Sequence, residues 1–187
     1  MNTDFDLLEF AGLSDEPAWT VSPPSTTDLR AVVNNRSFAT VEEVGKAIAS
    51  CIGETINAEE IEPPDSEVQW AMRVQIKVLP SDLLVWAEPL HDDAKASTGI
   101  REGWTLAVQT MLHSEDPLTH FSNLMRLLGG IHLDIDQVCD LSTGRWFPKH
   151  ILTSVFESQE LEPPEEVLWV TRVVEAPEEN EPDERWA

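Results

Sequence analysis

A fourteen-residue pattern that occurs twice is the feature that most constrains the fold. Residues 62–75 read Glu-Pro-Pro-Asp-Ser-Glu-Val-Gln-Trp-Ala-Met-Arg-Val-Gln, and residues 162–175 read Glu-Pro-Pro-Glu-Glu-Val-Leu-Trp-Val-Thr-Arg-Val-Val-Glu. One extra residue after the first prolines aligns Trp70 with Trp169 and the arginines that follow them. Because proline cannot donate to a β-ladder, each copy predicts a strand that begins after the prolines.

The segments that precede the two copies also correspond in kind and in order. A strand pattern at 28–33 leads to Arg-Ser-Phe at 36–38, and a strand pattern at 136–140 leads to Arg-Trp-Phe at 145–147. A helical pattern follows each tripeptide. We therefore predict an internal duplication, because a missed repeat would give the wrong fold. The alternative is coincidence in a chain that is rich in Glu and Pro.

Strand patterns account for much of the chain. Apolar residues alternate from Val68 to Val78 with Arg73 and Lys77 on the other face, which is typical of a strand with one solvated face. A turn then leads to a second strand at 83–88, so the pair predicts an antiparallel hairpin. Further strands are predicted at 29–34, 104–112, 135–140 and, centrally in the sheet, at 167–174.

Three helices are predicted between these strands. Thr40 and Glu43 have the spacing of a capping box before an apolar stripe that ends at Ile52. Asp116 and Pro117 predict the start of a second helix, which Gly129-Gly130 close. Pro148 is predicted to open the third helix, which runs to about Glu157. Residues 54–66 and 89–103 are expected to be polar connections.

These patterns together predict an α+β fold with a largely antiparallel sheet and helices mainly on one face. Residues 28–175 are expected to form a single domain built from two related strand–helix–strand halves, at 28–89 and 104–175. Residues 1–27 are predicted to be a flexible acidic segment, and 176–187 a disordered acidic tail. Hydrophobic residues make up 41% of the chain, which is enough for a core.

The charge of the chain narrows the classes of partner. Thirty-five acidic and 12 basic residues give a formal net charge of -23. This charge disfavours direct contact with nucleic acid phosphates or an anionic membrane surface. The favoured partner is a basic protein, and the alternative is an acidic surface that serves solubility or a salty habitat.

The cysteines and the termini indicate a cytoplasmic protein. Cys51 and Cys139 match neither a zinc spacing nor a disulfide framework, so we expect two reduced thiols. The first residues lack the basic region of a signal peptide, and no apolar run approaches the roughly 20 residues of a transmembrane helix.

The central segment carries a resemblance. Asp-Pro-Leu-Thr-x-Phe at 116–121, Leu-Met-Arg-Leu-Leu at 124–128, and the later Val-Cys-Asp and Arg-Trp at 138–146 resemble a segment of uncharacterised bacterial proteins of the planctomycete type. The similarity covers roughly residues 104–174. It implies no activity and no functional residue.

Four arginines and one tryptophan are the candidate binding residues. Arg36 and Arg145 follow the first strand of each half, Arg73 and Arg172 lie within the repeated pattern, and Trp146 joins this set. In a chain with so few basic residues, each arginine is expected to pair with a nearby carboxylate in preference to a ligand.

Metal-assisted hydrolysis is the alternative chemistry. His91, Asp92, His113 and His120 could contribute to a divalent metal site, although polar loop residues explain them equally well. The chain has no nucleophile elbow and no Gly-rich phosphate loop, so no catalytic residue and no cofactor is assigned. We therefore expect a non-enzymatic interaction protein with an acidic surface, for example an inhibitor or immunity protein for a basic partner. A small metal-assisted hydrolase is the alternative.

Overall fold

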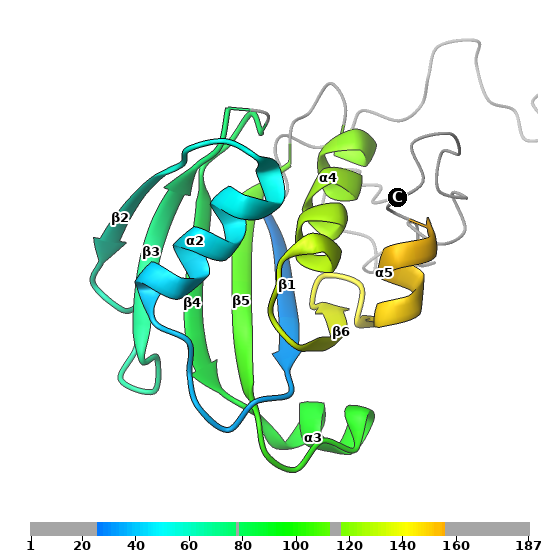
Figure 1. The fold of residues 1–187 in the computed structure, drawn as a ribbon. Coiled ribbons are helices and arrows are strands. Elements are labelled where there is room, and N and C mark those ends of the chain that lie inside the picture. Colours follow the sequence, from blue (N-terminus) through cyan, green and yellow to red (C-terminus); the bar gives the residue numbers. More distant parts are fainter. Residues whose placement is uncertain (1–25, 78, 113–116, 156–187) are drawn as a thin grey trace, which may run out of the picture. The chain divides into compact units, whose positions relative to one another are not determined.

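The computed structural model describes residues 26–77, 79–112 and 117–155, which form a seven-stranded antiparallel sheet and four helices (Figure 1). The strands are β1 (Thr26–Val33), β2 (Asn57–Ile61), β3 (Trp70–Gln75), β4 (Leu83–Pro89), β5 (Trp104–Met111), β6 (Ile135–Asp140) and β7 (Arg145–Pro148). The helices are α2 (Val41–Ile52), α3 (Asp92–Thr98), α4 (Pro117–Gly130) and α5 (Lys149–Val155). The predicted α+β class with an antiparallel sheet is confirmed.

The first strand in the sequence lies inside the sheet. The strand order is β2-β3-β4-β5-β1-β6-β7, so β1 separates β5 from β6. Leu29 of β1 is in register with Val108 of β5 on one side and with Asp140 of β6 on the other. The complete sheet therefore forms only when segments far apart in the sequence meet. Its two edge strands are β2 and β7.

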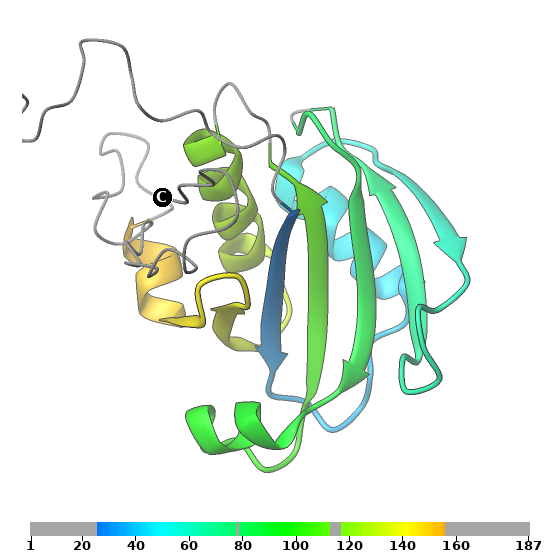
Figure 2. The same cartoon turned by 180° about the vertical axis from the view of Figure 1, so that it is seen from behind.

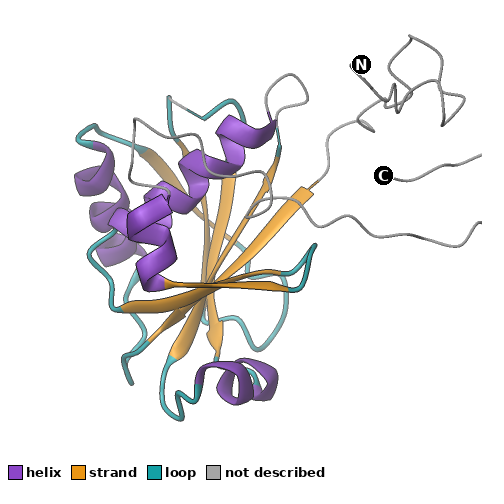
Figure 3. Cartoon of the chain, turned by 90° about the vertical axis from the view of Figure 1, so that its right-hand side faces the viewer, coloured by secondary structure: helices purple, strands orange, loops and turns teal. Residues whose placement is uncertain are grey.

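The main core lies between the sheet and three helices. Alternate residues of β1, namely Leu29, Ala31 and Val33, are buried in one cluster with residues of α2, α4 and α5. These three helices cover one face of the sheet (Figures 1 and 3). Helix α3 lies at one end of the sheet on the other side (Figure 3), and Figure 2 shows the sheet from this second face. We call this second face the rear face.

Local sequence signals set the limits of α2. The Thr40 hydroxyl accepts a hydrogen bond from the Glu43 N–H at 3.2 Å, and the Glu43 carboxylate accepts one from the Thr40 N–H at 2.8 Å. Val44 and Ile48 are buried on the core side of the helix. Gly53 ends the helix at a φ of 73°, which glycine adopts without steric cost. The predicted capping box is confirmed.

Three elements differ from the sequence prediction. β2 lies within the predicted connection 54–66, and α3 lies within the predicted connection 89–103. β7 forms just before Lys149, where Pro148 was expected to open a helix directly. β2 and α3 have no fully buried residue, so neither carries the apolar periodicity from which elements are predicted. β7 is short and gains its hydrogen bonds from β6.

The predicted duplication is not shown. Arg36 lies in the loop after β1, whereas Arg145 begins β7. Trp70 lies in β3, but Trp169 lies outside the described residues, as do the predicted strand at 167–174 and both acidic terminal segments. The equivalence of the two halves therefore stays a prediction.

A close approach of two backbones makes glycine necessary at position 103. A Cβ built on Gly103 would lie 2.5 Å from the carbonyl oxygen of Val33, a backbone atom that cannot turn aside. We expect Gly103→Ala to lower the free energy of unfolding by about 1–3 kcal/mol, as overpacking does. Urea denaturation followed by circular dichroism measures this change.

Gly45→Ala is the matched control. A Cβ at Gly45, inside α2, meets only Ile56 Cδ1 at 4.0 Å, so alanine should raise the free energy of unfolding by about 0.5–1 kcal/mol. Equal stability of the two variants would contradict the close approach at Gly103.

Candidate functional site

The edge strand β2 and the loops on either side of it concentrate negative charge. We call the six acidic residues of this segment the acidic edge: Glu54, Glu59, Glu60, Glu62, Asp65 and Glu67. All six are exposed, and the sequence has no Lys or Arg between Lys46 and Arg73. The charge therefore arises from one continuous stretch of chain on the folded surface.

The carboxylates of the acidic edge are largely uncompensated. Asp65 accepts hydrogen bonds from the backbone N–H groups of Glu67 at 2.8 Å and Val68 at 3.3 Å, which orders the turn before β3. Within the described ranges, the five glutamate side chains of the acidic edge form no ion pair or hydrogen bond. Like charges on one segment of the chain repel one another, and a bound cation would relieve that repulsion.

Arg73 is the predicted binding residue that lies beside this edge. It is exposed in β3 and is in register with Glu59 of β2. The pair forms no ion pair within the described ranges. Arg73 and Glu59 both lie on the rear face, because their neighbours Met72 and Val74 belong to the main core.

A second charged group, which sequence reasoning missed, is centred on Arg30 of β1. Its guanidinium contacts Glu88 of β4, with Nε 2.9 Å from Oε1, and also pairs with Asp28. Arg30 Cζ lies 4.7 Å from the centre of the Trp86 ring, and the Trp86 indole donates to Glu88 Oε2 at 2.8 Å. The alternation of Asp28 and Arg30 with apolar residues in one strand is the signal that could have revealed it.

The Arg30 group is a structural ion-pair network. The Arg30 and Glu88 side chains are only 17% and 10% exposed. Burial lowers the pKa of the Arg30 guanidinium, and the Glu88 carboxylate opposes that effect. The cation is paired with two carboxylates and stacked on an aromatic ring, so its partners are groups of the protein itself. These interactions connect β1 to β4 on the rear face of the sheet.

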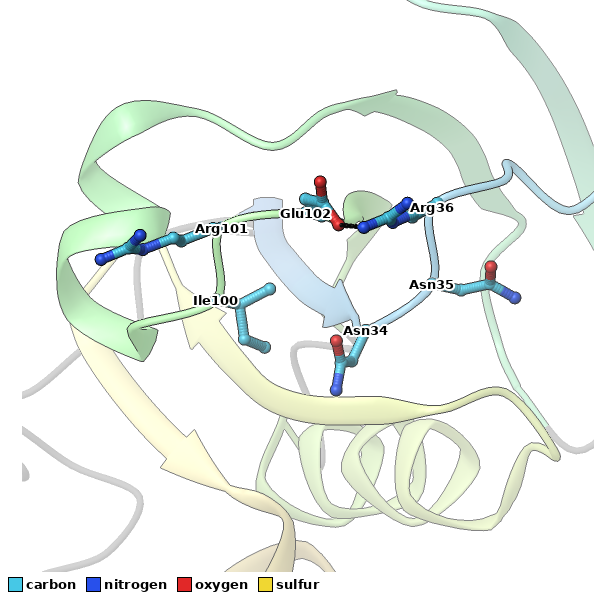
Figure 4. A pocket seen from close by; sticks show the side chains of 6 residues that line it. All are labelled: Asn34, Asn35, Arg36, Ile100, Arg101 and Glu102. Carbon is cyan, nitrogen blue, oxygen red and sulfur yellow. Dashed lines mark ion pairs between the residues drawn. The ribbon is translucent and has the colours of Figure 1, made fainter.

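Arg36 lies at a surface hollow (Figure 4). The loop after β1 and the loop before β5 enclose about 610 Å³, lined by Asn34, Asn35, Arg36, Ile100, Arg101 and Glu102. The Arg36 guanidinium and the Glu102 carboxylate point toward one another and form an ion pair, whereas Arg101 points away from them. Their side chains are 79% and 58% exposed, so this pair contributes about 0–1 kcal/mol to stability.

The remaining predicted binding residues lie elsewhere. Arg145 and Trp146 lie in the edge strand β7, in register with Asp140 and Cys139 of β6. Both β7 residues are partly exposed. Arg172 lies outside the described residues. The structure therefore does not gather the four described members of the predicted set into one site.

The predicted metal ligands that the structure describes are also dispersed. His91 precedes α3, near the end of the sheet where Pro89 is in register with Trp104. His120 is buried in the first part of α4, which follows the opposite end of β5. Asp92 forms an ion pair with Lys95, and His113 lies outside the described residues. Within the ranges that the structure describes, no group of three or more His, Cys, Asp or Glu residues could hold a metal ion.

The surroundings of the two cysteines do not favour a reactive thiol at Cys139. Both thiols are free, as expected. Burial raises the pKa of the Cys139 thiol, and the carboxylate of Asp140 adds to this effect. Cys139 therefore keeps its proton near neutral pH, which makes it a poor nucleophile.

Comparison with known proteins identifies no relative. No family model, curated protein or solved structure matches the chain. The resemblance of residues 104–174 to planctomycete-type proteins therefore stays a prediction. None of the helices in the described part of the chain is long and apolar enough to cross a bilayer.

The Arg30 group yields a stability prediction. Arg30→Met should lower the free energy of unfolding by about 3 kcal/mol, because it leaves the buried Glu88 carboxylate without its cation. The double variant Arg30→Met/Glu88→Gln should recover much of this loss, since the glutamine oxygen can still accept from Trp86. Urea denaturation of the wild type, both single variants and the double variant measures the coupling. Additive effects of the two substitutions would contradict the network.

Proposed function

We propose that the protein is a cytoplasmic, non-enzymatic interaction protein that binds a basic protein partner. The observation that carries this proposal is the acidic edge. Its glutamates are exposed, lie in one segment of the chain and have no partners among the described residues, whereas the buried charges of Arg30 and Glu88 pair with each other. Carboxylates that only served the fold would be expected to pair with neighbouring cations, as Glu42 pairs with Lys46.

Charge complementarity gives the interaction its physical basis. A concentrated negative field attracts a basic partner over about a Debye length, which is roughly 8 Å at physiological ionic strength. It also repels acidic proteins, which supplies selectivity. In one form of this proposal, the protein is an inhibitor or immunity protein that covers the cationic site of a nuclease or another effector.

A set of three neutralising substitutions tests the proposal. The variant Glu59→Gln/Glu60→Gln/Glu62→Gln removes three charges from the acidic edge and retains the size of the side chains. We expect it to recover about tenfold less basic protein than the wild type in a pull-down from the native cell at low salt. Recovery by the wild type should fall steeply as salt is raised, because screening weakens exposed charges.

The control removes the same charge elsewhere. Asp93→Asn/Asp134→Asn/Asp136→Asn also changes the net charge by three, but these residues lie outside the acidic edge. This variant should recover basic protein as the wild type does. If the two triple variants behave alike, the total charge and not the acidic edge governs binding, and the proposal fails.

A further inference from the structure

The free side of β2 presents unpaired backbone groups in a defined pattern. Among the described strands, β2 is the outermost in the sheet and is in register only with β3. Its residues are exposed except Ile61, which is partly buried, so the other described residues leave the edge uncovered (Figure 1). An open edge of this kind is a template for another strand.

The backbone groups that face outward can be derived from the register of the sheet. The Leu141 N–H donates to the Asp28 carbonyl, so the even-numbered residues of β1 bond to β6 and the odd-numbered ones to β5. Continuing this alternation through β5, β4 and β3 assigns Asn57, Glu59 and Ile61 to the ladder with β3. The N–H and C=O groups of Ala58 and Glu60 therefore point away from the sheet.

Charge decides which strand can occupy this edge. A second copy of the chain would place its own acidic edge against the first, and like charges directly opposite one another destabilise a strand pair. An extended segment with basic side chains would instead meet carboxylates on both faces of β2, because Glu59 lies on the rear face and Glu60 on the helix-covered face. The acidic edge thus disfavours pairing with a second acidic strand and favours a cationic one.

We propose that a basic, extended segment of the partner adds to the sheet as a strand beside β2. The backbone of Ala58 and Glu60 forms the new ladder, and the glutamates of the acidic edge pair with Lys or Arg side chains on both faces of the added strand. This inference rests on the proposed function and specifies its mode of binding. β2 has five residues, so the added strand pairs over about 17 Å.

The substitution Ala58→Pro tests the ladder without changing the charge. Proline removes an N–H that faces outward, so the bonds between β2 and β3 remain. Ala58→Val is the matched control, because valine keeps the N–H and favours a strand. The probe is a nine-residue synthetic peptide that repeats Lys-Lys-Thr three times, so that both faces carry lysines, and its affinity is measured by isothermal titration calorimetry at low salt.

We expect Ala58→Pro to weaken peptide binding about tenfold, as loss of a main-chain hydrogen bond and the steric bulk of the ring imply. Ala58→Val should bind as the wild type does. The same peptide carrying N-methyl groups at alternate residues keeps its charge but loses donors on one edge, and it should also bind about tenfold more weakly. Hydrogen exchange by NMR should show new protection of the Ala58 and Glu60 amides when the unmodified peptide binds.

The outcomes separate this inference from the proposed function. If Ala58→Pro and the N-methylated peptide bind normally while Glu59→Gln/Glu60→Gln/Glu62→Gln binds weakly, strand addition is overturned and recognition by charge stands. If the triple glutamine variant binds the peptide as tightly as the wild type, the acidic edge is not the binding surface and both proposals fail. Circular dichroism of every variant verifies the fold.

Discussion

The insertion of β1 between β5 and β6 is the pairing on which the rest of the structure depends. It joins the β2–β5 meander to the β6–β7 hairpin, and it places Leu29, Ala31 and Val33 beneath the helices. Closing these long loops costs conformational entropy, which the apolar burial along β1 must offset. The same pairing leaves β2 at an edge, so the position of the candidate binding surface follows from where β1 lies.

Charged side chains are buried and paired near the centre of the sheet but exposed at the β2 edge. In the centre of the rear face, Arg30 is enclosed by Glu88, Asp28 and Trp86, because an unpaired charge there would be costly. At the β2 edge the carboxylates are exposed to solvent, so they need no partner among the described residues. This contrast distinguishes charges that maintain the fold from the charges on which the proposed interaction depends.

Sequence patterns predicted those elements that bury a regular apolar stripe. The alternation around Trp70 predicted β3, and the capping residue Thr40 predicted the start of α2, because both depend on interactions within a few residues. β2 and α3 were missed since neither has a fully buried residue. Arg36 and Arg145 were predicted as equivalent binding residues, but they lie in a loop and a strand.

The sequence by itself determined the α+β class, the core-facing residues of the longer elements and the excess of negative charge, because these depend on composition and short-range periodicity. Only the tertiary structure decided that β1 lies between β5 and β6, that Arg30 meets Glu88 and that the backbone of Ala58 and Glu60 faces outward. Each of these features depends on the pairing of strands that are distant in the chain. Local patterns cannot specify that pairing, because many strand orders satisfy the same alternation of apolar and polar residues.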